Sequence, residues 1–558
     1  MQILKTFNPF LIVILMAVLL LAGWLGSRGL AEPDETRFSE ISREMALQTD
    51  WLIPHLNGVP HFQKPPLTYW ITATFIRRFG ANEWAVRLTP ALAAFGTLLF
   101  TMVIAGILYG KTCRWQAGLI LVASLLFASL ARIITTDMLL TFFITAAVAG
   151  LVGYVHLGRK SGLALFYLCM GLGFLTKGPL AILIPSFAGA AIQAGKWRQR
   201  KPVSPMYWWL GLPVALLIGL SWYLAILHRD RTMFDYFFRY EFVERFASNT
   251  HNRSKPIWFY PAVMVVGFLP WAALLPVVLR DAWRQRRSLA SANGWLFIGW
   301  VIVPYIVLSL VVSKLATYLL PLMPPMSILL ARWLEHPTTA DRWRVPARIA
   351  AGLLAVILLA LPTLALSPRI RLPQFGDLPI SFWLVMVLVL GSVLILWRAL
   401  GRNLSLNAFL FWMTGTWICM LLALASQANV LMPGGNRSVR ALTEAIKRLD
   451  PAGTVPVLAF SCRANGAEFY LQRYVYRGHS RSDVVLPLDG EMIQRIVPDV
   501  RVAADALLGH PAFIIVKHKA YLKEVGLQKW QDVLRDGPWQ LLASPDVASL
   551  NDAPFRHD

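Results

Sequence analysis

The feature that most constrains this chain is the recurrence of long apolar runs. They come about every thirty residues from the N-terminus to about residue 424, and many approach the length that an α-helix needs to cross a bilayer. Hydrophobic residues make up 56% of the chain and charged residues only 15%, against about 25% charged in soluble proteins. Because a backbone in lipid must satisfy its own hydrogen bonds, these runs predict a polytopic α-helical membrane protein.

We expect about thirteen transmembrane helices, on a sliding hydropathy view. They lie near residues 8–26, 86–108, 115–130, 138–155, 162–175, 179–194, 207–227, 257–278, 294–312, 315–330, 349–366, 380–397 and 404–424. Several are shorter than about 20 residues, so we expect tilted or partly sunken helices. The first run is too long for a signal peptide and lacks a small-residue cleavage site, so we expect it to stay as a helix.

The net charge of +23 first suggests a nucleic-acid partner, but its distribution argues against one. Alternate loops carry 19 basic residues against three acids, Asp281, Glu335 and Asp341. The basic residues are Lys5, Lys111, Arg114, Arg159, Lys160, Lys196, Arg198, Arg200, Lys201, Arg280, Arg284, Arg286, Arg287, Arg332, Arg342, Arg344, Arg348, Arg398 and Arg402. By the positive-inside rule this side is cytoplasmic, so the basicity indicates topology. Loops 27–85 and 228–256 then face outward, together with the region after the last span.

The first outer loop is unusually rich in charge. Between residues 32 and 70 it contains Glu32, Asp34, Glu35, Arg37, Glu40, Arg43, Glu44, Asp50 and Lys64. In a chain that is otherwise mostly apolar, charged residues concentrated in one loop indicate a catalytic role or the binding of a polar substrate.

Within this loop, apolar residues at helical spacing predict a short amphipathic helix over 34–47, lying on the membrane surface. Asp34 and Arg37 then share one face, and the helix N-terminus favours an ionised Asp34. The alternative, that Asp34 only caps this helix, stays open. Two prolines after Lys64 fix its position, and a second interfacial helix is expected from Leu67 to Phe79.

Single charges mark the outer ends of later spans. Asp137 opens the fourth span, Lys177 lies between two short helices, and Lys314 and Tyr318 lie at the end of the tenth. Each fits an ordinary snorkelling residue, but together with Arg37 and Lys64 they predict a lined cavity. Two arginines of loop 228–256, Arg245 and Arg253, reach either this cavity or lipid headgroups, and the sequence does not separate these alternatives.

The sequence predicts no cofactor and no metal site. His55 and His61 match no standard ligand spacing, and the four cysteines form no disulfide or metal pattern. A divalent cation near the outer-face cavity is left open.

The chain divides into a transmembrane part, 1–428, and a C-terminal outer part, 429–558. The C-terminal part reads as a small soluble α/β domain. We expect a helix at 438–449, strands at 455–460, 512–516 and 539–543, and a helix near 527–534. It has no phosphate-binding glycine motif, so we expect it to support the fold or substrate access and to supply no catalytic group.

An outward-facing cavity of this composition suits one kind of chemistry. No nucleotide sugar is available outside a bacterial inner membrane, so the substrate is expected to be activated and carried by a lipid. Lysines and arginines bind a lipid-linked phosphate and stabilise it as it departs. Carboxylates steer an acceptor, take a proton, or stabilise oxocarbenium-like character at a sugar.

The order of motifs resembles the GT-C membrane glycosyltransferases, which use polyprenyl-phosphate sugars. The segments DETRFSEISREM, KPPLTYW and AVRLTPAL resemble more closely the 4-amino-4-deoxy-L-arabinose lipid A transferases, the ArnT family. This resemblance implies an inverting transfer of aminoarabinose from undecaprenyl phosphate to lipid A phosphates, at the periplasmic face of the inner membrane. It implies Asp34 and Asp137 as catalytic carboxylates and Arg37 and Lys64 as phosphate-facing cations.

By the same resemblance, Lys177, Lys314 and Tyr318 are further substrate-binding residues. Arg245 and Arg253 are candidates from their place in loop 228–256. The expected partners are an undecaprenyl-phosphate-linked sugar, lipid A and membrane lipids, without nucleic acid. Two other classes stay open. A protein O-mannosyltransferase-like enzyme would need a base for its hydroxyl acceptor and a cleft for a peptide. A lipid or sugar flippase would need mid-membrane charges or related halves, and the sequence shows neither.

Overall fold

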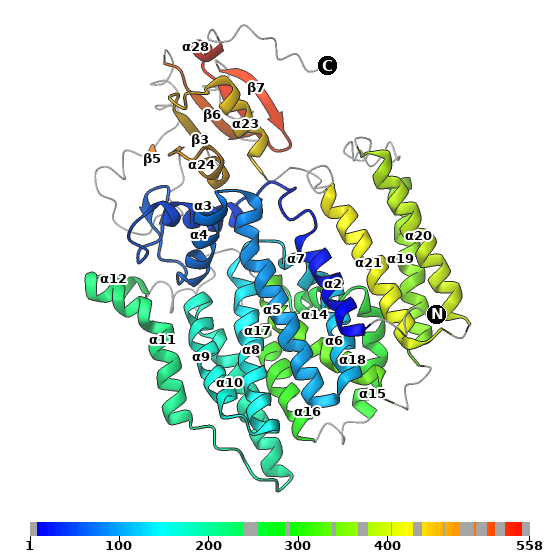
Figure 1. Cartoon of the computed structure of the whole chain (residues 1–558). Coiled ribbons are helices and arrows are strands. Elements are labelled where there is room, and N and C mark those ends of the chain that lie inside the picture. The colour runs from blue at the N-terminus through cyan, green and yellow to red at the C-terminus, as the bar shows by residue number, and fades with distance from the viewer. Residues whose placement is uncertain are drawn as a thin grey trace.

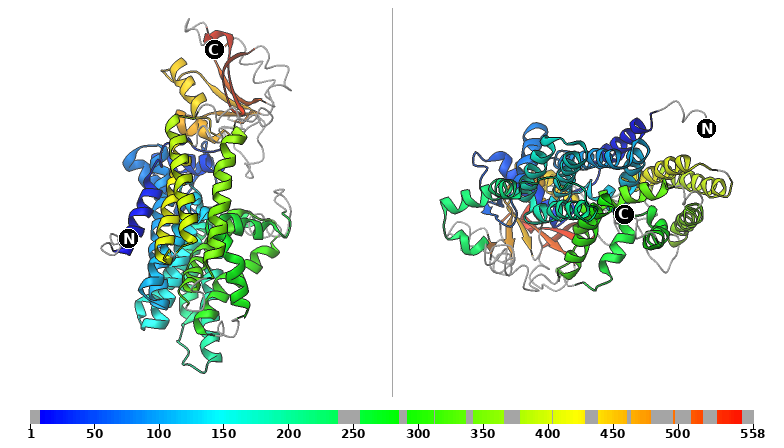
Figure 2. Two further views of the ribbon diagram at one scale, coloured as in Figure 1. Left: turned by 90° about the vertical axis from the view of Figure 1, so that its right-hand side faces the viewer. Right: turned by 90° about the horizontal axis from the view of Figure 1, so that it is seen from below.

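The computed structural model describes residues 8–237, 255–284, 291–311, 313–336, 342–365, 378–402, 404–427, 438–460, 464–478, 496–497, 510–518 and 530–548. Residues up to 427 form a helical bundle, and those from 438 onward form a mixed sheet with helices. The bundle is elongated, and the sheet lies beyond one of its ends (Figure 1 and Figure 2).

The elements of the helical part follow one another with short connections. They are α2 (Pro9–Ala22), α3 (Asp34–Leu47), β1 (His55–Leu56), β2 (Val59–Pro60), α4 (Leu67–Phe79), α5 (Glu83–Tyr109), α6 (Lys111–Ala123), α7 (Leu125–Leu130), α8 (Thr136–Leu157), α9 (Lys160–Lys177), α10 (Leu180–Arg198), α11 (Trp208–Arg229), α12 (Met233–Asp235), α14 (Phe259–Gly267), η2 (Trp271–Leu274), α15 (Leu275–Arg284), α16 (Ala292–Phe297), η4 (Ile298–Ile302), α17 (Val303–Leu310), η5 (Ala316–Leu322), α18 (Met323–Leu334), α19 (Arg344–Ala365), α20 (Ile380–Leu400) and α21 (Leu406–Ser426).

Several of these helices are long and apolar enough to cross a membrane. Within the described residues there are six: α5, α8, α11, the continuous helix Asn293–Leu310, α20 and α21. A seventh would be the pair Phe259–Gly267 and Trp271–Arg284, which is bent by 113°. All of them fall on expected spans, which supports a multi-pass membrane protein. The expected total of about thirteen stays a prediction.

Other expected spans are shorter or broken. The run 8–26 is helical only over the 14 residues of α2, because the chain turns extended at Gly23. The run 115–130 is divided at Ser124, whose extended backbone separates α6 from α7. The run 315–330 begins as the 3₁₀-helix η5, which contains Pro321, before α18 continues it. Hydropathy marks apolar length, but it does not detect these local breaks.

The centre of the bundle is α8, of which 78% is buried over its most apolar window. It packs against α5, α9 and α10. The crossing of α8 and α9 is close because glycines face each other there: a Cβ on Gly150 would clash with the carbonyl oxygen of Gly162. Helices α19, α20 and α21 form a separate layer at the side of the bundle (Figure 2).

Helices α3 and α4 lie across the end of the bundle that faces the sheet (Figure 1). The sequence predicted both helices, and α4 has the expected bounds. Only Asp34, Arg37 and Leu47 are not buried along α3, so the helix lacks the broad exposed face of an amphipathic helix, and its position on the membrane surface stays a prediction. It is covered by α4 and by a helix of the C-terminal part, α24 (Asn465–Leu471). It is therefore enclosed by protein, although its sequence reads as amphipathic.

The C-terminal part contains a six-stranded sheet in the order β5–β4–β3–β6–β8–β7. Its elements are α23 (Arg440–Leu449), β3 (Val457–Phe460), α24, β4 (Tyr476–Gly478), β5 (Ile496–Val497), β6 (Phe513–Lys517), β7 (Gln531–Asp536), β8 (Trp539–Ala543) and α28 (Pro545–Ala548). Strand β3 pairs in parallel with β4 and β6, and β8 is antiparallel to both β6 and β7. The division of the chain at 428 and 429 stays a prediction.

One expected element of this part is wrong. The stretch near 527–534 was expected to be helical, but residues 531–536 are strand β7. Gly537 and Pro538 form the two-residue turn between the paired residues Asp536 and Trp539, and Gly537 has a positive φ of 57°. A glycine that opens a two-residue loop between strands is a strong hairpin signal, so the turn residues predict this segment better than its apolar pattern.

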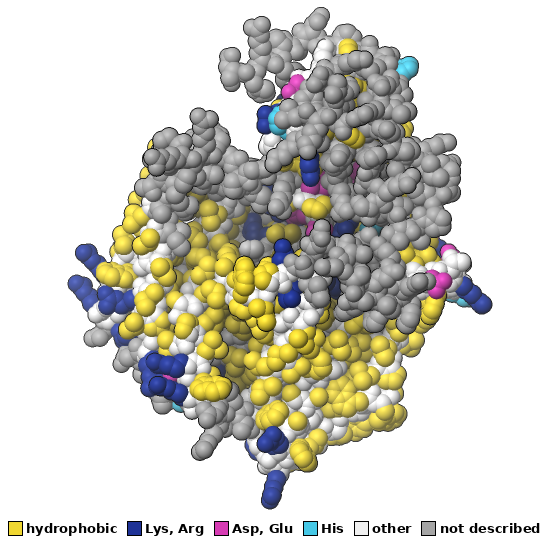
Figure 3. All heavy atoms as spheres, turned by 180° about the vertical axis from the view of Figure 1, so that it is seen from behind, with side chains coloured by type: hydrophobic (Ala, Val, Ile, Leu, Met, Phe, Trp, Pro, Cys, Tyr) yellow, Lys and Arg dark blue, Asp and Glu magenta, His cyan; other side chains and the backbone are white. Residues whose placement is uncertain are grey.

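The outer surface of the bundle is broadly apolar, and groups of Lys and Arg side chains lie on its flanks and at its lower tip (Figure 3). Two residues of the basic loops pack on rings in or next to α16, which lies at the end of the bundle away from the sheet (Figure 1). The Arg198 guanidinium lies 5.5 Å from the Trp295 ring centroid, and that of Arg332 lies 5.1 Å from the ring centroid of Tyr109. Tyr109 in turn stacks on Phe297 at 6.4 Å. This grouping agrees with the expectation that these loops share one side.

Candidate active site

Asp34 is the first residue of α3, and its side chain is 57% exposed. Its Oδ1 accepts a hydrogen bond from Nη2 of Arg37 at 2.7 Å, one helical turn later. No side-chain capping bond is present at the start of α3, so the alternative in which Asp34 only caps this helix is wrong.

The other acids around Asp34 are buried. Glu32, Glu35, Glu40 and Glu44 are 6%, 2%, 1% and 7% exposed. Between residues 32 and 44, Asp34 is thus the acid that remains accessible to a substrate.

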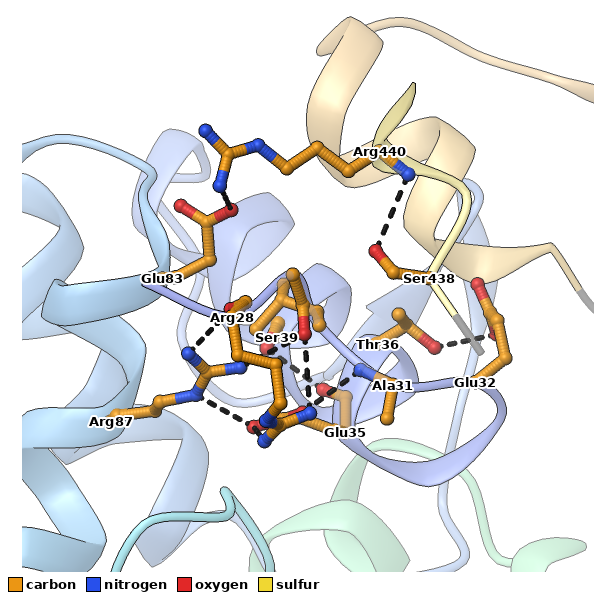
Figure 4. Close-up of polar contacts among 12 residues, drawn as sticks. Arg28, Ala31, Glu32, Glu35, Thr36, Ser39, Glu83, Arg87, Ser438 and Arg440 are labelled. Atoms are coloured by element: carbon orange, nitrogen blue, oxygen red, sulfur yellow. Dashed lines mark hydrogen bonds and ion pairs between the residues drawn. The ribbon is translucent and has the colours of Figure 1, made fainter. Parts of the chain in front are cut away.

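Glu35 is held by two arginines (Figure 4). Nε of Arg87 donates to its Oε1 at 2.9 Å, and Nη1 of Arg28 lies 2.9 Å from its Oε2. Arg87 also donates to the backbone carbonyls of Leu25, Arg28 and Gly29. Burial raises the pKa of Glu35, but attraction to Arg87 and Arg28 outweighs burial, and the pKa lies below its ordinary value. Glu35 is therefore a buried carboxylate that ties α3 to the start of α5.

Further along α3, three buried carboxylates meet. One carboxylate oxygen each of Glu40, Glu44 and Glu468 lies within 4.8 Å of the others. Glu40 pairs with Arg43 at 2.6 Å, and Glu44 accepts the backbone N–H groups of Asn57 and Gly58. Burial raises the pKa of Glu40 well above its ordinary value, and Arg43 offsets this only in part. Since these groups already have protein partners, we assign no cation to the cluster.

Lys64 lies in the segment between β2 and α4 and is partly buried. Phe62 anchors this segment, because its ring packs on Trp222 and Tyr236, both with centroids at 6.3 Å. On the other side, Pro65 and Pro66 lead directly into α4. The position of Lys64 is therefore restricted on both sides, as its sequence predicted.

A second group of expected residues comes together where α8 begins and α9 ends. Asp137 in the first turn of α8 makes a close ion pair with Lys177, the last residue of α9. Their side chains are 9% and 11% exposed. Each charge lies at the helix end that stabilises it, the acid at an N-terminus and the base at a C-terminus. This arrangement fixes both groups.

Tyr318 and Lys314 belong to the segment around η5. The ring of Tyr318 lies under the Lys177 ammonium, with Nζ 4.8 Å from the ring centroid. Lys314 is 8% exposed and makes no ion pair with a carboxylate of the described residues. A buried ammonium without an acidic partner is suited to bind an anion. Arg245 and Arg253 lie outside the described residues.

Two apolar clusters connect these groups. Ile134, three residues before Asp137, packs in one cluster with Leu30 and Phe38 of the α3 region. Phe62, two residues before Lys64, packs in another with Leu175, two residues before Lys177. The expected site residues that the structure describes therefore belong to one end of the bundle, in and around α3 and α4.

Sequence reasoning missed the residues that support this site. Arg87 lies in the AVRLTPAL motif, but the motif alone indicates no role for it. An arginine near the start of a membrane helix is the available signal, because such charges are rarely without a partner. The contacts of α24 with the first loop gave no comparable signal, since they join residues more than 400 positions apart.

The comparisons with known proteins agree with this architecture. Residues 63–223 match the family described as dolichyl-phosphate-mannose-protein mannosyltransferase. The undecaprenyl phosphate-α-4-amino-4-deoxy-L-arabinose arabinosyl transferase of Edwardsiella ictaluri (strain 93-146) is 35% identical over 321 residues, 56% of this chain and 57% of that protein. The matched stretch thus spans a little more than half of that relative. The enzyme of the same name from Serratia proteamaculans (strain 568) is 32% identical over 67% of this chain and 68% of that protein.

A solved structure matches almost the whole chain. The crystal structure of ArnT from Cupriavidus metallidurans in the apo state is similar with a TM-score of 0.80 and 24% identity, over 98% of this chain and 99% of that one. The structure of the same protein bound to undecaprenyl phosphate gives a TM-score of 0.77. The fold is therefore that of ArnT. With 33% identity across 73% of the Pseudomonas aeruginosa (strain UCBPP-PA14) enzyme, the chain belongs to the family of undecaprenyl phosphate-aminoarabinose arabinosyl transferases.

Proposed function

We propose that this protein is a glycosyltransferase that moves 4-amino-4-deoxy-L-arabinose from undecaprenyl phosphate to a phosphate group of lipid A. Its family membership supports the donor, since the relatives are named for it. The observation that carries the proposal for the site is the accessible Asp34–Arg37 pair at the same end of the bundle as the Asp137–Lys177–Tyr318 group. Carboxylates and cations are thus concentrated where a lipid-linked phosphate would enter.

In the proposed reaction an oxygen of the lipid A phosphate attacks the anomeric carbon of the sugar. The bond from that carbon to the carrier phosphate breaks, and its electron pair leaves with undecaprenyl phosphate. Attack from the opposite face inverts the configuration. Arg37, Lys64 and Lys314 bind the departing phosphate and stabilise its charge. Lys177, held by Asp137 and Tyr318, is a further cation at this site.

The role of Asp34 follows from the acceptor. A phosphate monoester is already largely anionic near neutral pH, since its second pKa is about 6. It therefore needs little help from a general base. We assign Asp34 to the donor sugar, where its carboxylate orients the ammonium group or stabilises positive charge at the anomeric carbon.

We further propose that the site and the C-terminal part face the periplasm of a bacterial inner membrane. The packing of Arg198 and Arg332 around α16, at the end of the bundle away from the sheet, supports this orientation, because such residues favour the cytoplasmic side.

The test uses purified protein, undecaprenyl phosphate-aminoarabinose and lipid A, with products read by mass spectrometry. Wild-type protein is expected to add aminoarabinose to lipid A. Asp34→Asn is expected to lower turnover by about a hundredfold or more, while binding of undecaprenyl phosphate stays within about twofold. Arg37→Ala and Lys64→Ala are expected to weaken that binding roughly tenfold or more each, because each removes a charge-assisted hydrogen bond to phosphate.

Asp50 and Arg229 provide matched controls. They form an exposed ion pair of 2.6 Å in the same outer region, with side chains 48% and 53% exposed. Asp50→Asn and Arg229→Ala therefore change the same charges outside the proposed site, and both should leave transfer and binding unchanged. Near-normal transfer by Asp34→Asn would contradict the assignment of Asp34. Transfer of mannose to a peptide hydroxyl instead of aminoarabinose to lipid A would overturn the proposed function and favour the protein mannosyltransferase alternative, which the match at 63–223 supports.

A further inference from the structure

The C-terminal part contacts the chain immediately before Asp34. The N–H of Gly466, in α24, donates to Oε1 of Glu32 at 2.6 Å. Nδ2 of Asn465 donates to the carbonyl of Pro33 at 3.4 Å. These bonds hold the two residues that precede Asp34, and they come from a helix more than 400 residues away in the sequence.

A third contact holds the chain slightly earlier. The N–H of Leu30 donates to Oη of Tyr470 at 2.8 Å, and Tyr470 donates in turn to Oε1 of Glu83 at 3.0 Å. Leu30 is fully buried, so its N–H depends on this hydroxyl. Burial and the nearby Glu83 raise the pKa of Tyr470, which keeps the hydroxyl protonated and able to donate.

The fit at this contact is tight. A Cβ on Gly466 would lie 2.9 Å from Oε1 of Glu32 and 3.0 Å from Cγ2 of Thr36. A Cβ on Gly29 would clash with Ser438, at the start of the C-terminal part. Figure 4 shows Ser438 and Arg440 above the loop, with Arg440 reaching Glu83 at 3.1 Å. Residues 29–33 thus lie directly against α24 and the segment that leads into α23.

The same stretch is held from the opposite side by the bundle. Arg87 binds the carbonyls of Arg28 and Gly29 and the carboxylate of Glu35. Asp34 therefore lies between two residues that are fixed by different parts of the protein, while its own carboxylate stays exposed. Removing the contacts on one side would leave the backbone of Asp34 free to shift.

We propose that α24 is a positioning element for Asp34. Gly466 and Tyr470 act through residues 30–33, which they hold against Arg87, so that the Asp34 carboxylate keeps a fixed direction. The C-terminal part then contributes to turnover without providing a group that touches the substrate. This inference rests on the proposed function, because it takes Asp34 as the residue that acts on the donor sugar.

The experiment compares Tyr470→Phe and Gly466→Ala with the wild-type protein and with Tyr476→Phe as control. Tyr476 is 45% exposed in the same part of the chain. Tyr470→Phe keeps the ring and removes the hydroxyl, which is both the acceptor of the Leu30 N–H and the donor to Glu83. Hydrogen exchange in peptides covering residues 28–37 is expected to be about tenfold faster in both test variants, because a buried donor loses its partner or the contact is forced apart.

Turnover is the second readout. For both test variants kcat is expected to fall by about ten- to hundredfold, because small misplacements of a reacting group have effects of that size. KM for the donor and binding of undecaprenyl phosphate should stay within about twofold, since Arg37 and Lys64 are intact. Tyr476→Phe should match the wild type in every measurement.

The outcomes separate the two proposals. If Tyr470→Phe shows the wild-type rate of hydrogen exchange at residues 28–37, α24 does not hold this segment and the proposal is refuted. Faster exchange there with unchanged kcat would refute the positioning role. Faster exchange throughout the bundle, with a lower unfolding midpoint, would indicate a merely structural contact and overturn the inference. Failure of the wild-type protein to transfer aminoarabinose would instead refute the proposed function, and with it the positioning role, while exchange still decides whether α24 holds the loop.

Discussion

Arg87→Met is the change that most directly tests how the first loop is held. The Arg87 side chain is 1% exposed and makes one bond to Glu35 and three to backbone carbonyls, at 2.7–3.1 Å. Methionine fills a similar length without charge. The variant therefore leaves Glu35 buried, with Arg28 and the Ala31 N–H as its partners among those bonds.

The expected loss of stability is about 3–5 kcal/mol, the usual effect of removing one partner from a buried ion pair. We expect the lower end of this range, because Arg28 still lies 2.9 Å from Glu35. Replacing both groups is expected to be less harmful than replacing one, since no uncompensated charge is then buried. The double variant Arg87→Met with Glu35→Gln should recover part of the loss.

The pH dependence gives a second signature. In the wild type the folded pKa of Glu35 lies below its ordinary value of 4.5. The ionised group therefore stabilises the fold above pH 4.5, and this contribution is lost as the pH falls through the folded pKa. Arg87 makes the largest of the interactions that lower this pKa, so we expect the folded pKa of Glu35 to rise in the variant. The folded variant then holds an extra proton, so its stability deficit should be smaller at about pH 5 than at about pH 8.

The assay is the apparent midpoint of thermal unfolding in detergent, measured at one heating rate because such unfolding is often irreversible. Arg28→Met is the matched control, since its side chain is 14% exposed and should matter less. A wild-type midpoint for Arg87→Met would refute the reasoning. So would a double variant whose loss equals the sum of the two single losses, because that result would mean that the two residues act independently.

Three further predictions follow from particular contacts. Tyr318→Phe keeps the ring under Lys177. Binding of the lipid carrier should therefore persist if only the ring matters, and weaken roughly tenfold if the hydroxyl binds phosphate. Tyr318→Leu removes the ring as well and should weaken carrier binding in either case. Burial raises the folded pKa of Glu40 above its ordinary value of 4.5. Stability therefore falls as the pH rises from the unfolded to the folded pKa of this group. Glu40→Gln removes the titrating group and should flatten this pH dependence of the unfolding midpoint. Reporter fusions after Ser426 and within residues 196–201 should indicate opposite sides of the membrane; the same side for both would overturn the proposed orientation.

The sequence predicted local elements well where one signal dominates. Helix α4 has its expected bounds because prolines precede it and Gly80 follows its last residue. Strand β8 also has its expected bounds, because a run of mostly apolar residues, from Trp539 to Ala543, directly follows a turn. The long helices α5, α8, α20 and α21 were predicted to within a few residues, since apolar length is the property that hydropathy measures.

The sequence did not predict that α3 is enclosed. The acids in and just before α3 indicate a solvent-facing side, but Glu35 pairs with Arg87, 52 residues away, and Glu32 accepts the N–H of Gly466, 434 residues away. A hydropathy pattern predicts the exposure of each side chain without knowledge of its interaction partners. An acid that is buried and paired with a base is therefore predicted to be exposed. The same limit applies to Asp137 and Lys177: both were expected at the outer ends of spans, but their pairing depends on how α8 packs against α9.

If the protein has the proposed function, the substrate contacts the accessible Asp34–Arg37 pair as it enters the site. An exposed pair one helical turn apart contributes only about 0.3–0.5 kcal/mol, whereas a charge-assisted hydrogen bond to phosphate contributes about 1.5–3 kcal/mol. The carrier phosphate would therefore take Arg37 from Asp34 at little energetic loss. Asp34 would then lack its counterion at the moment when the aminoarabinose ammonium and the anomeric carbon arrive. A buried pair such as Glu35–Arg87 could not exchange partners in this way, since separating it would leave a charge without solvent. The exposure of Asp34, among acids that are otherwise buried, is thus the property that allows it to act on a substrate.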